Sequence, residues 1–332
     1  MIDYLLLLFR VLVFPGFTFI ILFTMFCDWV ERKIEARMQN RMGPTFTGPS
    51  GMLQPIADFI KLLTKEEITP VDTKRNSYKI APILALTTLI FAMCFLPVDG
   101  QSVIPGVSFT GDLIFVMSLV TVANFLLFLA GWSSTNPYSA VGAARVLTQF
   151  LGYDIPLVML ALAPAFLAKS ITISTIVAVQ LQWLPFAILA PWAFVLFVIT
   201  MQAELEKDPF DVPHAESEVV AGHETEYSGA KLAFLKLARD VQIVFGAALI
   251  TVLFLGGANG PVPFGFLPEF WGTLWFVLKV IGVVVVSEYM TVLFARLRID
   301  QVVRVNWRIV LPFSVLSLIL TIGLAYWIYP LL

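Results

Sequence analysis

Hydrophobic positions in this chain run in long blocks, and most polar positions lie between them. A transmembrane helix needs about 20 mostly apolar residues. Eight blocks are close to this length, and they span residues 5–27, 80–97, 112–132, 146–168, 183–203, 233–256, 271–295 and 309–331. The pattern predicts an all-α polytopic membrane protein with about eight transmembrane helices, in which residues 1–332 form a single integral membrane domain.

The first long polar segment contains an amphipathic stretch. Residues 43–51, GPTFTGPSG, alternate Gly and Pro and therefore favour tight turns. After them, apolar side chains recur at helical spacing, with Asp58 and Lys61 off the apolar face. We expect a short amphipathic helix of about 13 residues, too short to cross a membrane. It could lie at the membrane interface, pack beneath the spans or form the wall of a site.

Basic residues lie mostly on one side of the predicted spans. The loops 28–79, 133–145, 204–231 and 296–308 hold sixteen of the 21 Lys and Arg residues. The loops after the second, fourth and sixth spans hold one, Lys169. Because Lys and Arg are enriched in cytoplasmic loops, we expect these four loops at the cytoplasmic face and both termini outside.

The composition supports a membrane protein without a redox cofactor of its own. Mean hydropathy is +0.88 and charged residues make up 13% of the chain. The net charge of −2 gives no basic surface for nucleic acid. Two cysteines are too few for an iron–sulfur cluster, which usually takes four thiolates, and no nucleotide-binding motif is present. We therefore expect the chain to provide a site or path for partner subunits.

Acidic residues gather in the segment AELEKDPFDVPHAESEVVAGHETEYSG (203–229), which holds eight of the chain's 23 carboxylates. A charge run of this kind usually forms a solvated face. Here, however, two prolines constrain the backbone, and large apolar residues alternate with the acids, unlike a flexible tether. The segment, called the acidic loop below, is either a solvated face or a structured site.

Charged residues also occur inside the predicted spans, where they are costly and usually face a partner or a polar path. They are Arg10, Asp154, Lys236, Arg239, Asp240, Lys279 and Glu288. Lys236 and Asp240 have the spacing of an i, i+4 ion pair. The set fits either internal ion pairs or a route for protons.

The two histidines, His214 and His223, have glutamates nearby and could in principle hold a metal. HETEY (223–227) lacks the second histidine of the HExxH motif, and the spacing fits no familiar metal site. No metal site is predicted.

Four segments carry a resemblance to a known family. They are the acidic loop, ERKIEARMQNRMGPTFTGPSGMLQPIADFIKLLTKE (31–66), GWSSTNPYSAVGAARVLTQFLGYDIPL (131–157) and RLRIDQVVRVNWRIVLPFS (296–314). Together they resemble the family of the quinone-chamber membrane subunit of respiratory complex I, an NADH:quinone oxidoreductase, including its archaeal-type relatives. The resemblance covers nearly the whole chain.

The resemblance implies a subunit of a proton-translocating quinone oxidoreductase. Quinone, the substrate, would enter from the bilayer and be reduced at an iron–sulfur cluster held by a neighbouring subunit. The implied partners are hydrophilic-arm subunits, small membrane-arm subunits and membrane lipid, without nucleic acid. The implied location is the inner (plasma) membrane of a prokaryote rather than an organelle.

The resemblance also implies roles for individual residues. The implied catalytic residues are Glu204, Asp211, Glu216, Glu218, Glu226 and Asp154. The implied chamber residues are Glu31, Arg32, Arg37, Asp58, Lys61, Phe210, Arg296, Arg298 and Asp300. The implied proton path consists of Arg145, Tyr153, Asp154, His214 and Asp240. The family has Glu where this chain has His214, Asp154 and Arg239, so the electron donor need not be NADH.

Two other functions remain open. The homologous subunit of a proton-reducing membrane-bound hydrogenase would need no quinone, although the full GPTFTGPSG loop favours a quinone chamber. A secondary transporter would explain the charges in the spans, but such transporters usually show internal repeats, and no repeat is visible.

Overall fold

The computed structural model describes residues 2–100, 102–104, 107–262 and 268–328. The elements of the first half are α1 (Ile2–Leu12), α2 (Phe17–Met38), η1 (Pro49–Gly51), α3 (Gln54–Thr64), α4 (Arg75–Met93), α5 (Asp112–Ser133) and α6 (Pro137–Ala168). Those of the second half are α7 (Ile173–Gln182), α8 (Phe186–Leu189), α9 (Pro191–Glu204), α10 (Glu216–Val219), η2 (Gly222–Glu224), α11 (Gly229–Phe254), α12 (Pro268–Leu293), α13 (Ile299–Val305), η4 (Asn306–Val310) and α14 (Leu311–Ile328). The described residues form no strand and only an isolated bridge between Pro97 and Ser102, which confirms the all-α prediction.

Seven of the predicted spans coincide with helical stretches that are long and apolar enough to cross a membrane, counted over the described ranges. The fifth, 183–203, does not: it is divided into α8 and the 14-residue α9. Pro191 stands at the first position of α9, where the missing N–H of proline leaves no hydrogen bond unmade, so it favours a new helix start there. α3 confirms the amphipathic helix in the first loop, with 11 residues.

Helices extend into the predicted loops, and they extend furthest at α2, α6 and α13. α2 continues to Met38, where Arg32 pairs with Asp28 one turn earlier at 2.7 Å. α6 begins at Pro137, because the Asn136 side chain caps the helix by accepting the Tyr138 N–H at 2.8 Å. α13 begins at Ile299 and continues through η4 into α14. The apolar blocks in the sequence end at the first charged residue. The helices continue past that point, because backbone hydrogen bonds do not depend on the charge of the side chain.

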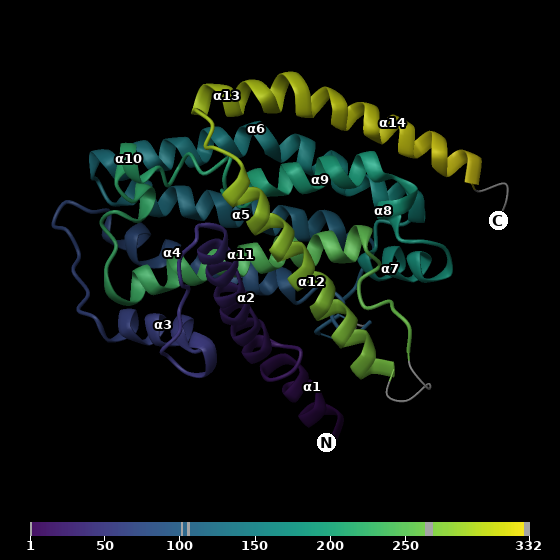
Figure 1. The fold of residues 1–332 in the computed structure, drawn as a ribbon, viewed down its shortest axis with the longest axis horizontal. Helices are drawn as coiled ribbons and strands as arrows, with labels where there is room; N and C mark the ends of the chain where they lie inside the picture. Colours follow the sequence, from purple (N-terminus) through teal and green to yellow (C-terminus); the bar gives the residue numbers. More distant parts are fainter. Residues whose placement is uncertain (1, 101, 105–106, 263–267, 329–332) are drawn as a thin grey trace.

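α11 is the central helix of the bundle. It packs against α2, α3, α4 and α12. In its most apolar stretch 89% of the residues are buried, against 28% for α12. Figure 1 shows α2 and α12 crossing the bundle obliquely, with α3 and α10 at one end and α7 and α8 at the other. α10 of the acidic loop and the amphipathic helix are therefore at the same end of the molecule, and the orientation of this end relative to the membrane stays a prediction.

A close backbone contact joins the acidic loop to α6. A Cβ atom on Gly142 would lie 2.7 Å from the backbone of Gly222. Gly142→Ala is therefore expected to lower the stability of the assembled protein by about 1–3 kcal/mol, because a well-packed contact must open. Thermal unfolding of the purified protein measures this change.

Gly282→Ala is the matched control for that substitution. Gly282 lies within α12, and a Cβ atom there would meet nothing within 4 Å. Since alanine favours a helix over glycine, this variant is expected to be neutral or more stable by up to about 1 kcal/mol. Equal melting temperatures for the two variants would contradict the close packing at Gly142.

Candidate functional site

The acidic loop is folded into the protein and is not a solvated face. The side chains of Phe210, Val212, Val219 and Tyr227 are each at most 4% exposed. Tyr227 stacks on Tyr78 of α4, with ring centroids 4.2 Å apart, and donates a hydrogen bond to the Ala130 carbonyl at 3.0 Å. The apolar residues that alternate with the acids thus anchor the loop between α4, α5 and α6.

Beneath the acidic loop lies a charged cavity of about 250 Å³. Its walls come from α2, α11 and the loop, and seven of the eight residues that line it are ionisable. The ionisable residues are Glu31, Arg32, Lys207, Glu224, Lys236, Arg239 and Asp240, and the eighth residue is Ile243. So dense a set of opposite charges suits a site that holds a polar group or water, but not an apolar core.

Lys207 links three parts of the chain around this cavity. Its Nζ atom lies 2.9 Å from Glu31 of α2 and 3.0 Å from Glu288 of α12. Burial opposes its charge, but the two carboxylates outweigh burial and raise the pKa of Lys207 above its usual value. Lys207 is therefore a buried cation held between two carboxylates.

Arg32 connects α2 to the amphipathic helix. Its guanidinium lies 2.7 Å from Asp28 and 2.8 Å from Asp58 of α3. A second cavity, of about 50 Å³, lies beside this group. It shares Arg32, Lys236 and Asp240 with the larger cavity, so α3 forms part of the wall of the charged region.

Asp211 forms a group with two arginines from other elements. Arg296, which follows α12, approaches Asp211 at 2.8 Å and Asp208 at 3.7 Å, and Arg239 of α11 lies 3.9 Å from Asp211. Burial raises the pKa of Asp211 to about 6, although both arginines act to lower it. Asp211 can therefore gain and lose a proton close to neutral pH.

Glu204 belongs to a buried hydrogen-bond network inside the bundle. Its carboxylate accepts from Asn124 of α5 at 2.8 Å and from Gln242 of α11 at 3.3 Å. Asn124 also donates to the Tyr153 hydroxyl of α6 at 3.3 Å. The network joins α5, α6, α9 and α11 below the acidic loop.

The predicted catalytic carboxylates do not share one cavity. Glu218 is half exposed and pairs with Arg145 at 2.5 Å. Glu226 accepts a hydrogen bond from Asn136, and Asp154 accepts one from Thr121 at 3.2 Å. The side chain of Glu216 lies outside the described part of the chain.

The predicted chamber residues fall into two groups. Glu31 and Arg32 line the charged cavity, Asp58 lines the smaller cavity, and Phe210 is buried in the apolar core. The others, Arg37, Lys61, Arg296, Arg298 and Asp300, are exposed. Of the predicted proton path, Asp240 lines both cavities, Tyr153 is in the Glu204 network, and His214 contacts Glu206 at 2.9 Å.

The sequence did not identify several residues of the site. The sequence shows that Lys207, Glu224 and Glu288 are charged. It does not show which residues lie next to them, because those residues come from distant segments. Asn124 and Gln242 are neutral amides inside apolar spans, and their presence there was a signal that counting only charges overlooks. Lys236 and Asp240 line the same cavity, and no ion pair joins them among the described side chains.

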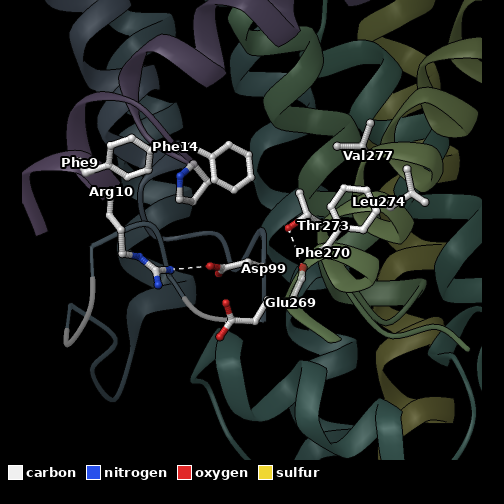
Figure 2. A pocket seen from close by; sticks show the side chains of 10 residues that line it. Phe9, Arg10, Phe14, Asp99, Glu269, Phe270, Thr273, Leu274 and Val277 are labelled. Atoms are coloured by element: carbon white, nitrogen blue, oxygen red, sulfur yellow. Dashed lines mark hydrogen bonds and ion pairs between the residues drawn. The ribbon is translucent and has the colours of Figure 1, made fainter. Parts of the chain in front are cut away.

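A larger cavity, of about 510 Å³, lies away from the acidic loop (Figure 2). It lies between α1 and the start of α12, and most of its wall is apolar. Figure 2 shows Arg10 of α1 reaching Asp99, at 2.6 Å, with Glu269 nearby. This pair explains how the first predicted span carries an arginine. The cavity has few of the ionisable groups that mark the charged cavity, so it is not the candidate site.

The fold and the charged cavity define a class: a polytopic all-α membrane protein with an ionisable site between its helices. A sequence family described as NADH dehydrogenase matches residues 11–322. The NADH-quinone oxidoreductase H-subunit of Carboxydothermus hydrogenoformans is 35% identical over 95% of this chain and 88% of its own length. The corresponding protein of Geobacillus kaustophilus, with the same name, is 39% identical over 90% of this chain and 88% of its own. That of Dehalococcoides mccartyi strain CBDB1 is 36% identical over 92% and 83%.

The chain therefore belongs to the H-subunit family of NADH-quinone oxidoreductase, a family of complex I membrane subunits. The resemblance seen in the four sequence segments is confirmed. Membership implies a multi-pass membrane protein that works with the other subunits of a complex I-type enzyme.

Proposed function

We propose that this chain forms the portal and chamber through which quinone reaches the terminal iron–sulfur cluster of a neighbouring subunit, and that its buried charges couple quinone reduction to proton translocation. The observation that carries the proposal is the charged cavity of about 250 Å³ between α2, α11 and the acidic loop. Hydrophilic-arm subunits would cover the end of the molecule that carries α3 and α10. The membrane would be the plasma membrane of a prokaryote.

Reduction of a quinone to a quinol takes two electrons and two protons. The cluster of the neighbouring subunit would supply the electrons, and this chain would supply or relay protons. Asp211 suits this role because its pKa is about 6. Glu224, in the wall of the cavity, also suits it, since burial raises its pKa against the opposing effects of Arg239 and Lys236.

The amphipathic helix α3 supports the position of the portal. Its side chains Ile60 and Leu63 are 53% and 42% exposed, while Asp58 on its other side pairs with Arg32 beside the smaller cavity. One side of α3 can thus face lipid or the quinone tail while the other supports the charged wall.

The Glu204 network supports a proton path from the acidic loop into the membrane. Glu204, Asn124 and Tyr153 form a hydrogen-bonded series at the end of α9, and Asp154 follows Tyr153 in α6. Ionisable groups in such positions usually mark a proton relay or a path for ions.

Asp211→Asn tests the chamber. It is expected to lower quinone reduction by about a hundredfold if Asp211 exchanges protons with the substrate, while reduction of an artificial acceptor by the hydrophilic arm stays unchanged. Arg296→Gln removes a cation that lowers the pKa of Asp211, so this pKa rises further. The profile of kcat/KM is expected to have an inflection near pH 6 in the wild type and at higher pH in Arg296→Gln.

Two results would contradict the proposal. Normal quinone reduction by Asp211→Asn would remove Asp211 from the chamber, and a complex that evolves hydrogen without reducing quinone would place the chain in a hydrogenase. An inflection that stays in place in Arg296→Gln would belong to a different group.

A further inference from the structure

Glu206, His214 and His223 come together in the acidic loop, from three separate turns of the chain. Each offers one ligand atom, and these atoms lie within 4.8 Å of one another. The His214 Nε2 atom is 2.9 Å from Glu206 Oε2, and the two imidazole rings have centroids 4.8 Å apart. We propose that these three side chains form a binding site for a divalent transition-metal ion of the Zn²⁺ type.

An unpartnered nitrogen is the independent sign of a ligand. The His223 side chain is 2% exposed, and its Nδ1 atom is buried without a hydrogen-bond partner. A buried polar atom left in this state costs about 1–3 kcal/mol. A metal ion bound by Nδ1 would remove this cost, whereas hydrogen bonding among the described groups does not.

The protonation states favour metal binding. Burial lowers the pKa of His223 to about 3, with further lowering by His214 and Arg239 against the effect of Glu206. Burial, together with Arg239 and Arg296, also lowers the pKa of His214 well below its usual value. Both imidazole rings are therefore neutral at pH 7. A metal ion could bind either ring without first removing the proton that makes an imidazolium.

The charged residues around the site have opposing effects on a bound cation. Arg239 of α11 repels a cation, while Glu206 would supply a negative ligand. Glu224 follows His223 directly, and Asp211 already lies 3.9 Å from Arg239, so two more carboxylates offset the arginine.

The ligand set identifies the class of ion. Two imidazoles and one carboxylate suit zinc and related transition metals, whereas calcium and magnesium prefer oxygen ligands. Three protein ligands leave a fourth position for water. The ion would fasten the end of α9, the turn after Pro213 and η2 to one another.

Packing holds His223 in place for this role. Gly131 of α5 lies so close that a Cβ atom there would be 2.6 Å from the His223 Cβ. The ring is thus fixed against the bundle, as a metal ligand needs to be.

The test uses the purified complex, stripped with a chelator and then titrated with Zn²⁺. Metal content and zinc-edge X-ray absorption are measured for the wild type and for His223→Gln, His214→Glu and Asp72→Asn. We expect the wild type to bind one more zinc than His223→Gln, with two imidazole ligands. His214→Glu keeps a ligand oxygen, so its zinc is expected to show one imidazole. Asp72 is an exposed carboxylate outside the cluster, so Asp72→Asn is expected to match the wild type.

Several outcomes would overturn the site. These are equal zinc content in the wild type and His223→Gln, a wild-type zinc without imidazole ligands, and an equal loss of zinc in Asp72→Asn. If His223→Gln fails to assemble, the wild type and His214→Glu still test the site. The same number of imidazole ligands on zinc in both proteins would exclude His214 as a ligand. None of these measurements depends on quinone reduction, so the site can fail while the proposed function stands.

Discussion

Lys207→Met is expected to destabilise the assembled protein by about 3–5 kcal/mol. The substitution removes the cation between Glu31 and Glu288, which lie 2.9 and 3.0 Å from it. Two carboxylates would then face each other in a site where the lysine is only 6% exposed. The yield of intact complex on a native gel and its melting temperature measure the effect.

Lys79→Met is the matched control, because it makes the same change at an exposed lysine. It is expected to alter stability by less than about 1 kcal/mol. A triple variant that adds Glu31→Gln and Glu288→Gln to Lys207→Met removes the unpaired charges and is expected to recover part of the loss. A Lys207→Met complex as stable as the control would mean that the three groups are not coupled.

Glu204→Gln is expected to lower proton translocation on the order of a hundredfold while leaving the complex assembled. Glutamine has nearly the shape of glutamate and can still accept hydrogen bonds from Asn124 and Gln242, but it cannot exchange a proton. Translocation by vesicles that contain the complex measures the effect, with quinone reduction followed in parallel.

Two companion variants separate a relay from a structural role. Asp154→Asn is expected to lower translocation as well, since Asp154 is the ionisable group that follows Tyr153. Glu204→Leu removes the carboxylate that accepts from Asn124 and Gln242 and places an apolar side chain against their amides, so it is expected to prevent assembly. If Glu204→Gln and Asp154→Asn translocate protons like the wild type, the network serves only to hold the helices together.

The sequence predicted the architecture because membrane solvation acts on average hydropathy. Long apolar blocks indicated the spans, and 3.6-residue periodicity indicated α3. The ends of helices were harder to predict where they do not coincide with the ends of apolar blocks. The Asn-Pro pair at 136–137 signals a helix start, yet a hydropathy pattern passes over it. Pro191 likewise divides a block that looks continuous by hydropathy alone.

The pairing of charges could not be predicted in this way. Lys207 meets Glu31 and Glu288, which belong to α2 and α12, near opposite ends of the chain. The two histidines come together in a loop that can approach α5 and α6 closely because Gly131 and Gly142 have no side chains. Such contacts depend on tertiary packing, which sequence spacing does not encode.

The burial of α11 bears on how this chain could diverge from its relatives. A charged residue in the cavity wall of so buried a helix is accepted only when the residues around it balance its charge. At Arg239 the balancing groups are present, because Asp211 lies 3.9 Å away and Glu224 lines the same cavity. Arg239 therefore belongs to a balanced electrostatic set, and a glutamate at this position, which the family resemblance implies for the relatives, would require compensating changes in the acidic loop.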